Sequence, residues 1–313
     1  MDNDNCNSIK KKMSLCNFED DGENEGDMID INKTMTKKYK ECSRELKVMS
    51  YNIWFDSYKN TERLISLVIN IENHKPDVIC MQEVTVAVYE RLKLKLQDYP
   101  YFYPENLKYT YSCVIFSKYP IVEQDYVEYT NTKMGRGLLA VVIQKEININ
   151  TQTGEKKKES KSSEQINTIE RNIVIATSHF ESEFNKYNSN KLSQYKEAKS
   201  ILDNYARVYD CVIFTADTNI LPSENKYYLD DGLNWLDSWI IDGSYNGKNY
   251  TYDTETNENL KNRKVRYIRS RIDRIIYKNS KLIKNHSYNL VKGLSELIEP
   301  SDHYGIMSTF HLL

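Results

Sequence analysis

The sequence lacks several features that would each have assigned it to a distinct class of protein. No stretch approaches the roughly 18 consecutive apolar residues of a membrane span, and the N-terminus carries no apolar core of a signal peptide. None of the six cysteines forms a CxxC pair or a zinc-type spacing with histidine. We therefore expect an intracellular protein with reduced thiols that does not associate with a membrane.

The sequence also lacks an excess of positive charge. The formal net charge is −2, whereas a protein that coats nucleic acid of any sequence is usually strongly basic. This balance argues against broad electrostatic binding of DNA but leaves room for a local basic groove. There is no internal repeat and no stripe that indicates oligomerisation, so we expect a monomer.

Two segments are too polar to belong to a core. Residues 1–43 consist mainly of Asp, Glu, Asn and Lys, and we predict a disordered tail followed by one domain over residues 44–313. Within the tail, Lys10-Lys11-Lys12 is either a weak nuclear import signal or simply a solvated run. Residues 151–169 separate two apolar runs and predict an exposed loop or hairpin.

The remaining chain alternates short apolar runs with amphipathic segments. Several runs are continuously apolar, which is typical of strands covered on both faces. Leu64, Leu67, Val68 and Ile71 follow helical spacing, with Thr61 as a plausible cap, and further helices are expected after Thr85 and over about 189–204. The pattern predicts an α/β domain with central sheets and outer helices.

Polar residues stand at the ends or starts of these predicted strands. Asn52, Glu83, His179 and Asp217 each end a run, whereas Asp273 and His303 each precede one. The ends of neighbouring parallel strands form the ligand-binding edge of a sheet, and the start of an antiparallel strand abuts its partner's end. All six side chains could therefore share one cleft.

Each of these residues also has an ordinary structural interpretation. Glu83 could be a solvated loop residue, Asp217-Thr218-Asn219 a plain turn, and Asp273 a member of a surface ion-pair cluster with the flanking arginines. Taken together, however, the set supplies carboxylate, amide and imidazole groups without cysteine. Oxygen-rich sites suit hard cations such as Mg²⁺, so the set indicates metal-assisted phosphoryl transfer to water.

The order of the motifs over about residues 46–313 resembles the endonuclease/exonuclease/phosphatase superfamily. The motifs that carry the resemblance are Asn52, Met81-Gln82-Glu83-Val84, Ser178-His179-Phe180-Glu181-Ser182, Asp217-Thr218-Asn219, Ser270-Arg271-Ile272-Asp273-Arg274-Ile275 and Ser301-Asp302-His303-Tyr304-Gly305. The resemblance implies a four-layer α/β sandwich, in which two packed mixed β-sheets are flanked by helices.

Local features outside this shared set are similar to the 5′-tyrosyl-DNA phosphodiesterases of the superfamily. They are Gln194 in a helix after the SHFES motif, the segment Tyr250-Thr251-Tyr252-Asp253-Thr254, and Thr132-Lys133-Met134 followed by Arg136. The resemblance implies hydrolysis of the bond between a topoisomerase II tyrosine and a DNA 5′-phosphate. It also implies a nuclear repair enzyme, which could act in the cytoplasm as well.

The resemblance implies a role for each candidate residue. Asp217 would deprotonate the attacking water, and Asn219, His179 and Asn52 would position the phosphate. Asp273 would keep His303 protonated against a non-bridging oxygen. The expected metal ligands are Glu83 and Asp302, which would bind Mg²⁺ or, in its place, Mn²⁺. The expected groove for a single-stranded DNA 5′ end that carries a tyrosyl peptide is lined by Arg136, Tyr252, Arg271 and Ser182.

The sequence departs from the family pattern in places. Ala216 replaces a usual glycine, and Leu221-Pro222 stands where an arginine usually follows the Asp-Thr-Asn motif, which puts one phosphate contact in doubt. The same core in other members cleaves abasic DNA, poly(A) RNA, inositol phosphates or sphingomyelin. A non-catalytic scaffold of the same fold is a further alternative, although such scaffolds typically lose the residues that here are Glu83 and His303.

Overall fold

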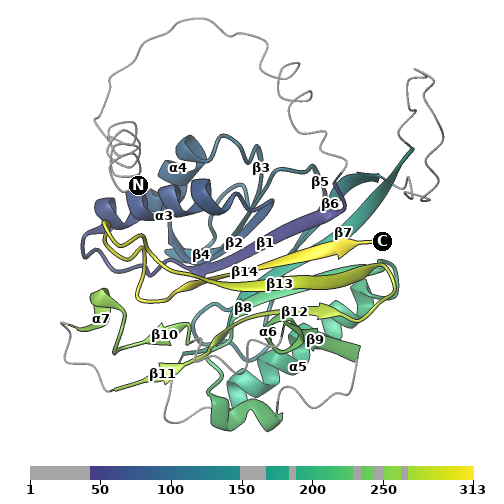
Figure 1. Cartoon of the computed structure of the whole chain (residues 1–313). Coiled ribbons are helices and arrows are strands. Elements are labelled where there is room, and N and C mark those ends of the chain that lie inside the picture. Colours follow the sequence, from purple (N-terminus) through teal and green to yellow (C-terminus); the bar gives the residue numbers. More distant parts are fainter. Residues whose placement is uncertain (1–42, 149–166, 183–187, 228–233, 243–249, 262–266) are drawn as a thin grey trace, which may run out of the picture.

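Two six-stranded sheets form the centre of the molecule (Figure 1). This computed structural model describes residues 43–148, 167–182, 188–227, 234–242, 250–261 and 267–313. The predicted tail and most of the predicted loop at 151–169 therefore lie outside the described residues, although the strand after that loop already begins at Thr168.

The first sheet has the strand order β13-β14-β1-β2-β4-β3. These strands are β13 (Ile283–Val291), β14 (Gly305–Leu312), β1 (Glu45–Asn52), β2 (Val78–Thr85), β4 (Tyr111–Ser117) and β3 (Tyr101–Tyr103). Only the pair β1–β2 is parallel, and the other pairs are antiparallel. The sheet is therefore mixed.

The second sheet has the order β5-β6-β7-β8-β12-β9. These strands are β5 (Ile121–Glu128), β6 (Gly137–Asn148), β7 (Thr168–His179), β8 (Cys211–Asp217), β12 (Asp273–Lys278) and β9 (Trp235–Asp237). It is also mixed, because β7–β8 is parallel and its other pairs are antiparallel. A small separate hairpin joins β10 (Tyr252–Asp253) to β11 (Arg269–Ser270).

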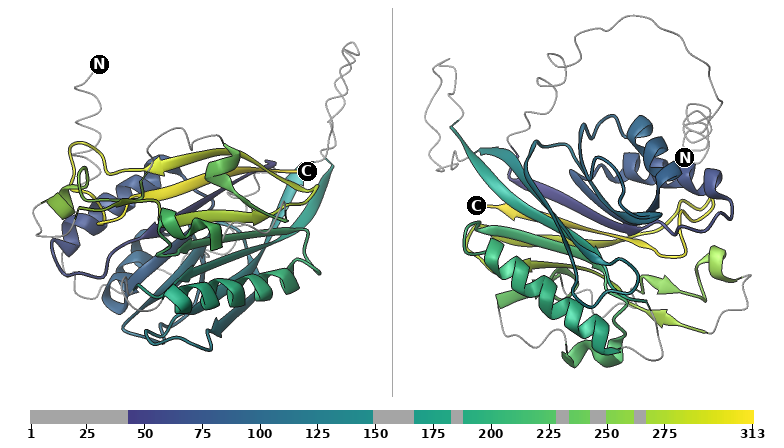
Figure 2. Two further views of the ribbon diagram at one scale, coloured as in Figure 1. Left: turned by 90° about the horizontal axis from the view of Figure 1, so that it is seen from below. Right: turned by 180° about the vertical axis from the view of Figure 1, so that it is seen from behind.

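Helices cover the outer faces of the two sheets. Figure 1 and the right-hand view of Figure 2 show α3 (Asn60–His74) and α4 (Val86–Lys95) on one side, and α5 (Asn188–Tyr205) on the opposite side. Shorter elements are the 3-10 helix η1 (Pro222–Tyr227), α6 (Ser238–Ile241) and α7 (Glu258–Lys261). The predicted four-layer sandwich is confirmed.

Strand alternation divides the apolar residues among these layers. Val48, Ile213 and Ile275 pack in the core between the sheets, whereas Met49 packs with the α3 and α4 side chains and Val212 with those of α5. Both faces of the central strands are thereby buried, which explains their continuous apolar runs.

The helix boundaries follow local chemistry. The helix expected after Thr85 is α4, and the Thr85 hydroxyl caps it by accepting from the Val88 N–H. The predicted cap at Thr61 is wrong, because α3 already begins at Asn60 after Lys59 in a left-handed conformation. The predicted apolar stripe of α3 is nevertheless buried. No helix in the described part of the chain combines the length and apolarity that crossing a membrane requires.

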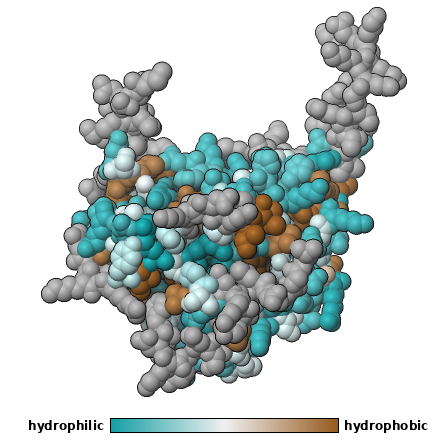
Figure 3. Space-filling view, turned by 60° about the horizontal axis from the view of Figure 1, so that its bottom comes forward, coloured by the Kyte–Doolittle hydropathy of each residue, from teal (hydrophilic) through white to brown (hydrophobic). Residues whose placement is uncertain are grey.

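Figure 3 shows one face of the molecule coloured by hydropathy. Hydrophilic residues cover most of what is coloured, and apolar residues gather in a few patches, one of them to the right of the centre.

Candidate active site

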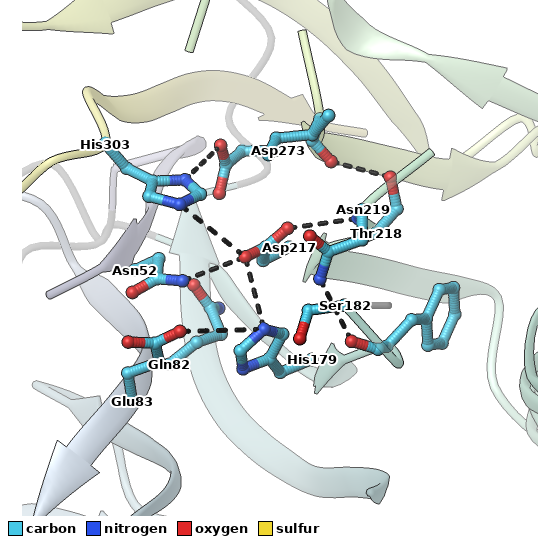
Figure 4. A network of polar contacts seen from close by, with 12 residues as sticks. Asn52, Gln82, Glu83, His179, Ser182, Asp217, Thr218, Asn219, Asp273 and His303 are labelled. Carbon is cyan, nitrogen blue, oxygen red and sulfur yellow. Dashed lines mark hydrogen bonds and ion pairs between the residues drawn. The ribbon is translucent and has the colours of Figure 1, made fainter. Parts of the chain in front are cut away.

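The strand registers bring the predicted residues together (Figure 4). The parallel pair β7–β8 sets His179 beside Asp217, and the antiparallel pair β8–β12 sets Asp217 opposite Asp273. In the other sheet, β1–β2 sets Asn52 beside Gln82, immediately before Glu83. The cleft therefore lies where the two sheets meet at one edge, as the strand-end pattern predicted.

Asp217 is the hub of this cluster. Its Oδ2 accepts a hydrogen bond from Asn52 Nδ2 at 2.8 Å and lies 3.3 Å from His179 Nε2, while its Oδ1 accepts from the Asn219 N–H at 3.1 Å. Burial and the negative charge of Asp273 raise the pKa of Asp217 to about 7, against the opposing effect of His303. A carboxylate with such a pKa can serve as a base near neutral pH.

His303 is held in its charged form. Burial acts to lower its pKa, but Asp273 and Asp217 outweigh burial, so the pKa of His303 lies well above its usual value. Its Nδ1 donates to Asp273 Oδ2 at 2.9 Å, and its Nε2 lies 3.9 Å from Asp217 Oδ2. The Nε2–H of this imidazolium can therefore donate to a phosphate oxygen.

His179 has the opposite protonation state. Burial, together with the positive charges of Arg136 and His303, lowers its pKa well below the usual value. Arg136 Nη1 lies 2.8 Å from His179 Nδ1, and a guanidinium can only donate, so Nδ1 accepts and Nε2 carries the proton. The contact with Asp217 is therefore made by a neutral imidazole and is not an ion pair.

Glu83 occupies a strained position that turns its side chain toward the cleft. It lies at an irregularity of the β2–β4 pairing and has a φ of 61°, which is unusual for a residue with a side chain. Its Oε2 accepts from the Phe55 N–H at 3.1 Å, and its Oε1 lies 3.8 Å from His179 Nε2. The strand thus departs from regular pairing at the residue predicted to bind the metal.

Several carboxylates of this region could contribute to a metal site. Asp217, Asp273 and His303 offer ligand atoms within 4.8 Å of one another. His303 is protonated and bonded to Asp273, however, and a metal needs neutral imidazole, so this group would offer a cation its carboxylates. Burial and the negative charge of Glu83 raise the pKa of Asp302 to about 6 against the opposing effect of His303. The assignment of Glu83 and Asp302 as metal ligands stays a prediction.

A model of the endonuclease/exonuclease/phosphatase family matches residues 49–303. The chain belongs to this family. It is 27% identical over 276 residues to tyrosyl-DNA phosphodiesterase 2 of Xenopus tropicalis, a match that spans 85% of this chain and 66% of that protein. The Bos taurus protein of the same name is 27% identical over 296 residues, which are 90% of this chain and 73% of that one. The chain thus spans about two thirds of the length of these relatives.

Solved structures of this family share the fold. The structure of D. rerio tyrosyl-DNA phosphodiesterase 2 with a single-strand DNA product superposes with a TM-score of 0.66 at 23% identity, covering 85% of this chain and 98% of that one. The structure of the human Nocturnin catalytic domain with a bound sulfate anion superposes with a TM-score of 0.62 at 18% identity, covering 86% of this chain and 94% of that one. At these identities the likeness concerns the fold.

Arg136 and His179 border a cavity of about 240 Å³ next to the cluster around Asp217. The lining residues include Tyr103, Tyr109, Tyr111, Tyr126, Arg136 and His179. The Arg136 guanidinium is buried and lies 5.5 Å from the centre of the Tyr111 ring. Its Nε donates to no acceptor among the described residues. A buried donor without a partner in the protein is costly, so this N–H remains available to an acceptor from outside the chain.

The remaining predicted groove residues fall in different places. The Tyr252 ring packs edge-on against the His303 ring at 5.2 Å, and the Ser182 hydroxyl donates to Met134 Sδ at 3.6 Å. The prediction that Arg271 lines the groove needs correction. Arg271 is buried, donates to both carboxylate oxygens of Asp237 and lies over the Trp239 ring at 4.4 Å. These contacts occupy its guanidinium away from the cluster around Asp217.

Sequence reasoning also missed residues that hold the site in place. Buried Lys191 on α5 donates to the Asn219 carbonyl at 2.9 Å and pairs with Glu224 at 3.2 Å. Glu224 in turn accepts a hydrogen bond from the Leu221 N–H. Lys191 and Glu224 therefore hold in place the segment in which the arginine usual in the family is absent. Asn219 itself has a φ of 50°, and its Nδ2 donates to the Phe180 carbonyl.

Buried Glu181 plays a similar part for the segment before Arg136. Its Oε1 accepts from the Thr132 hydroxyl and from the Lys133 and Met134 N–H groups at 2.9, 2.7 and 3.1 Å. The motif SHFES contains this glutamate, and membership of the motif was the only feature of the sequence that pointed to Glu181. Its role depends on a contact between residues nearly fifty positions apart, which no local pattern reveals.

Proposed function

We propose that this family member is a magnesium-dependent 5′-tyrosyl-DNA phosphodiesterase. It would hydrolyse the phosphodiester that joins a tyrosine side chain, such as that of trapped topoisomerase II, to a DNA 5′ end. The products would be a free tyrosyl peptide and a 5′-phosphate. As parts of the same proposal, it acts as a monomer in the nucleus and also in the cytoplasm.

The observation that carries this proposal is the tyrosine-lined cavity beside His179. Its volume of about 240 Å³ is sufficient for an aromatic side chain, and Arg136, one of its lining residues, supplies a positive charge beside it. A phenolate leaving group has a pKa of about 10 and needs electrostatic stabilisation more than a strong acid. The named activity of the relatives points in the same direction.

Asp217 would accept a proton from the attacking water. Its Oδ2 is held by Asn52 and by the neutral His179, and its pKa of about 7 suits a base. The water oxygen bonds to phosphorus and the bond from phosphorus to the tyrosyl oxygen breaks, so the electron pair leaves with the phenolate. His303 would donate to a non-bridging oxygen and stabilise its developing charge.

The residues expected to hold Mg²⁺ are Glu83 and Asp302, and Mn²⁺ is expected to substitute. A bound cation would supply charge neutralisation at the phosphate oxygens. Glu83 suits this role because its carboxylate reaches the cleft from a strained backbone position that regular pairing would not allow. The chain thus provides the base and the cation site from different sheets.

The DNA strand is expected on the Tyr252 side of the site. The Tyr252 ring lies against His303, so it can stack on a base when the phosphate contacts His303. Ser182, whose hydroxyl contacts Met134 Sδ, is the further hydroxyl expected to meet the DNA backbone. A single strand suits this arrangement, because an unpaired base exposes its face to an aromatic ring.

The test is release of tyrosine from a 5′-phosphotyrosyl single-stranded oligonucleotide in Mg²⁺, with an abasic duplex and a poly(A) strand in parallel. We expect rapid release of a 5′-phosphate end and little cutting of the other two. Cutting of either control without tyrosine release would instead favour an abasic endonuclease or a deadenylase. No cutting of any substrate would favour a scaffold.

A paired variant tests the cavity directly. Arg136→Met should slow release of tyrosine more than release of p-nitrophenol from the same oligonucleotide, because the more acidic phenol needs less stabilisation. Arg207→Met, at an exposed position after α5, serves as the control. An equal loss for the two leaving groups would show that Arg136 does not act on the phenolate.

A further inference from the structure

An exposed aromatic ring stands at the rim of the cleft on the Glu83 side. Phe55 is 49% exposed, although a phenyl ring is usually buried. Its ring stacks on Tyr111 with centroids 4.8 Å apart and planes 11° apart. Tyr111 lines the cavity that Arg136 borders, so Phe55 extends this aromatic wall outward.

The segment that carries Phe55 is held rigidly. Buried Arg63 on α3 donates to the carbonyls of Ile53, Asp56 and Tyr58 at 2.7, 2.7 and 3.0 Å. The Phe55 N–H itself donates to Glu83 Oε2. One ring face is stacked and the segment is fixed, so the remaining exposed surface is a preorganised platform, which lowers the entropy cost of binding.

The position of this platform indicates which part of the substrate it meets. His179, whose Nε2 lies 3.3 Å from Asp217 Oδ2, also lines the cavity that Arg136 and Tyr111 share. The proposed function places the leaving tyrosine in this cavity, so the peptide residue next to that tyrosine would meet Phe55, which stacks on Tyr111. Tyr252, on the His303 side, is left for the DNA.

We infer that Phe55 and Tyr111 form a recognition site for an aromatic or apolar side chain next to the tyrosine in the leaving peptide. This inference rests on the proposed function. It makes Phe55 a determinant of which protein adducts are processed efficiently. A stacked pair of rings corresponds to about a threefold to tenfold effect on binding.

The experiment uses the full chain and two oligonucleotides of identical sequence. One carries a 5′-phosphotyrosyl tripeptide flanked by phenylalanine, and the other carries the same tripeptide flanked by glycine. For wild type we expect a lower KM with the phenylalanine peptide. In Phe55→Ala this preference should shrink by about threefold to tenfold, with kcat for the two substrates changing in parallel.

Two further variants make the result decisive. Phe55→Trp should restore the preference, and Leu94→Ala, at an exposed apolar residue on α4, should leave it unchanged. A preference that survives in Phe55→Ala overturns the inference. The inference is also overturned if the loss of activity in Phe55→Ala depends on whether the first nucleotide of the oligonucleotide carries a base. Such a dependence would show that Phe55 contacts the DNA. Absence of release from both peptides by wild type rejects the proposed function itself.

Discussion

Two buried charge clusters lie on β12 and its neighbours, and they differ in whether every carboxylate oxygen has a hydrogen-bond donor. In the cluster around Asp237, two guanidinium groups share one carboxylate, Trp239 covers Arg271, and both Asp237 oxygens accept hydrogen bonds. In the cluster around Asp217, three ionisable groups lie close together, and Asp273 Oδ1 has no hydrogen-bond donor among the described residues. We call the first the closed cluster and the second the open cluster, because of this difference between their carboxylate oxygens.

Strand alternation separates these clusters. Asp273 faces Asp217 and His303, whereas its neighbour Arg274 pairs with Asp237. Burial and the positive charge of Arg271 lower the pKa of Arg274 to about 10, so it stays charged at neutral pH. The comparison teaches that charge and burial alone do not indicate function, because both clusters have them and only the cluster around Asp217 has a carboxylate oxygen without a donor among the described residues.

Replacing the hub of the open cluster should have the largest effect. Asp217→Asn is expected to lower kcat about a hundredfold to ten-thousandfold, because it removes the base. The melting temperature should stay the same or rise, because the substitution removes a carboxylate whose charged form is disfavoured by burial, as its raised pKa indicates. Tyrosine release and a thermal melt check this. Loss of activity together with a collapsed melt would assign Asp217 a structural role.

The closed cluster should respond in the opposite way. Asp237→Asn removes the carboxylate that Arg271 and Arg274 share and is expected to cost about 3 kcal/mol of unfolding free energy, as for a broken buried ion pair. Denaturant unfolding measures this value. Activity per folded molecule should persist. A fully stable Asp237→Asn variant without activity would remove the distinction between the two clusters.

The pH dependence sharpens the comparison further. The pKa of Asp217 is raised to about 7, so its base form is lost as pH falls through that value. Below it, kcat/KM should fall about tenfold per pH unit. At high pH, kcat/KM should fall again when His303, whose pKa is raised, loses its proton. If Asp302→Asn abolishes the acidic limb, Asp302 rather than Asp217 is the group that titrates.

The smallest expected effect concerns the cation. Saturating Mg²⁺ should raise the melting temperature of wild type by about a few degrees, because a ligand that binds only the folded state stabilises it. Glu83→Gln should lose this shift, whereas Glu90→Gln, on the outer surface of α4, should retain it. Equal shifts in both variants would place the cation elsewhere.

Much of the site was readable from the chain because catalytic side chains stand at strand ends. Asn52, Glu83, His179 and Asp217 each follow a continuous apolar run, and parallel pairing aligns such ends. Lys191 and Glu181 could not be predicted in the same way. Each acts through a contact with a backbone segment distant in sequence, and a buried charge on a helix looks like any solvated residue until its partner is known.

The sequence by itself determined the family, the layers and the kinds of groups available for catalysis, because periodicity and motif order are local properties. Only the tertiary structure decided that Arg136 faces the cavity while Arg271 is occupied by Asp237. It also decided that His303 is charged and His179 neutral, since both pKa values depend on which charges lie within a few ångströms. Such distances are set by packing between segments that are far apart along the chain.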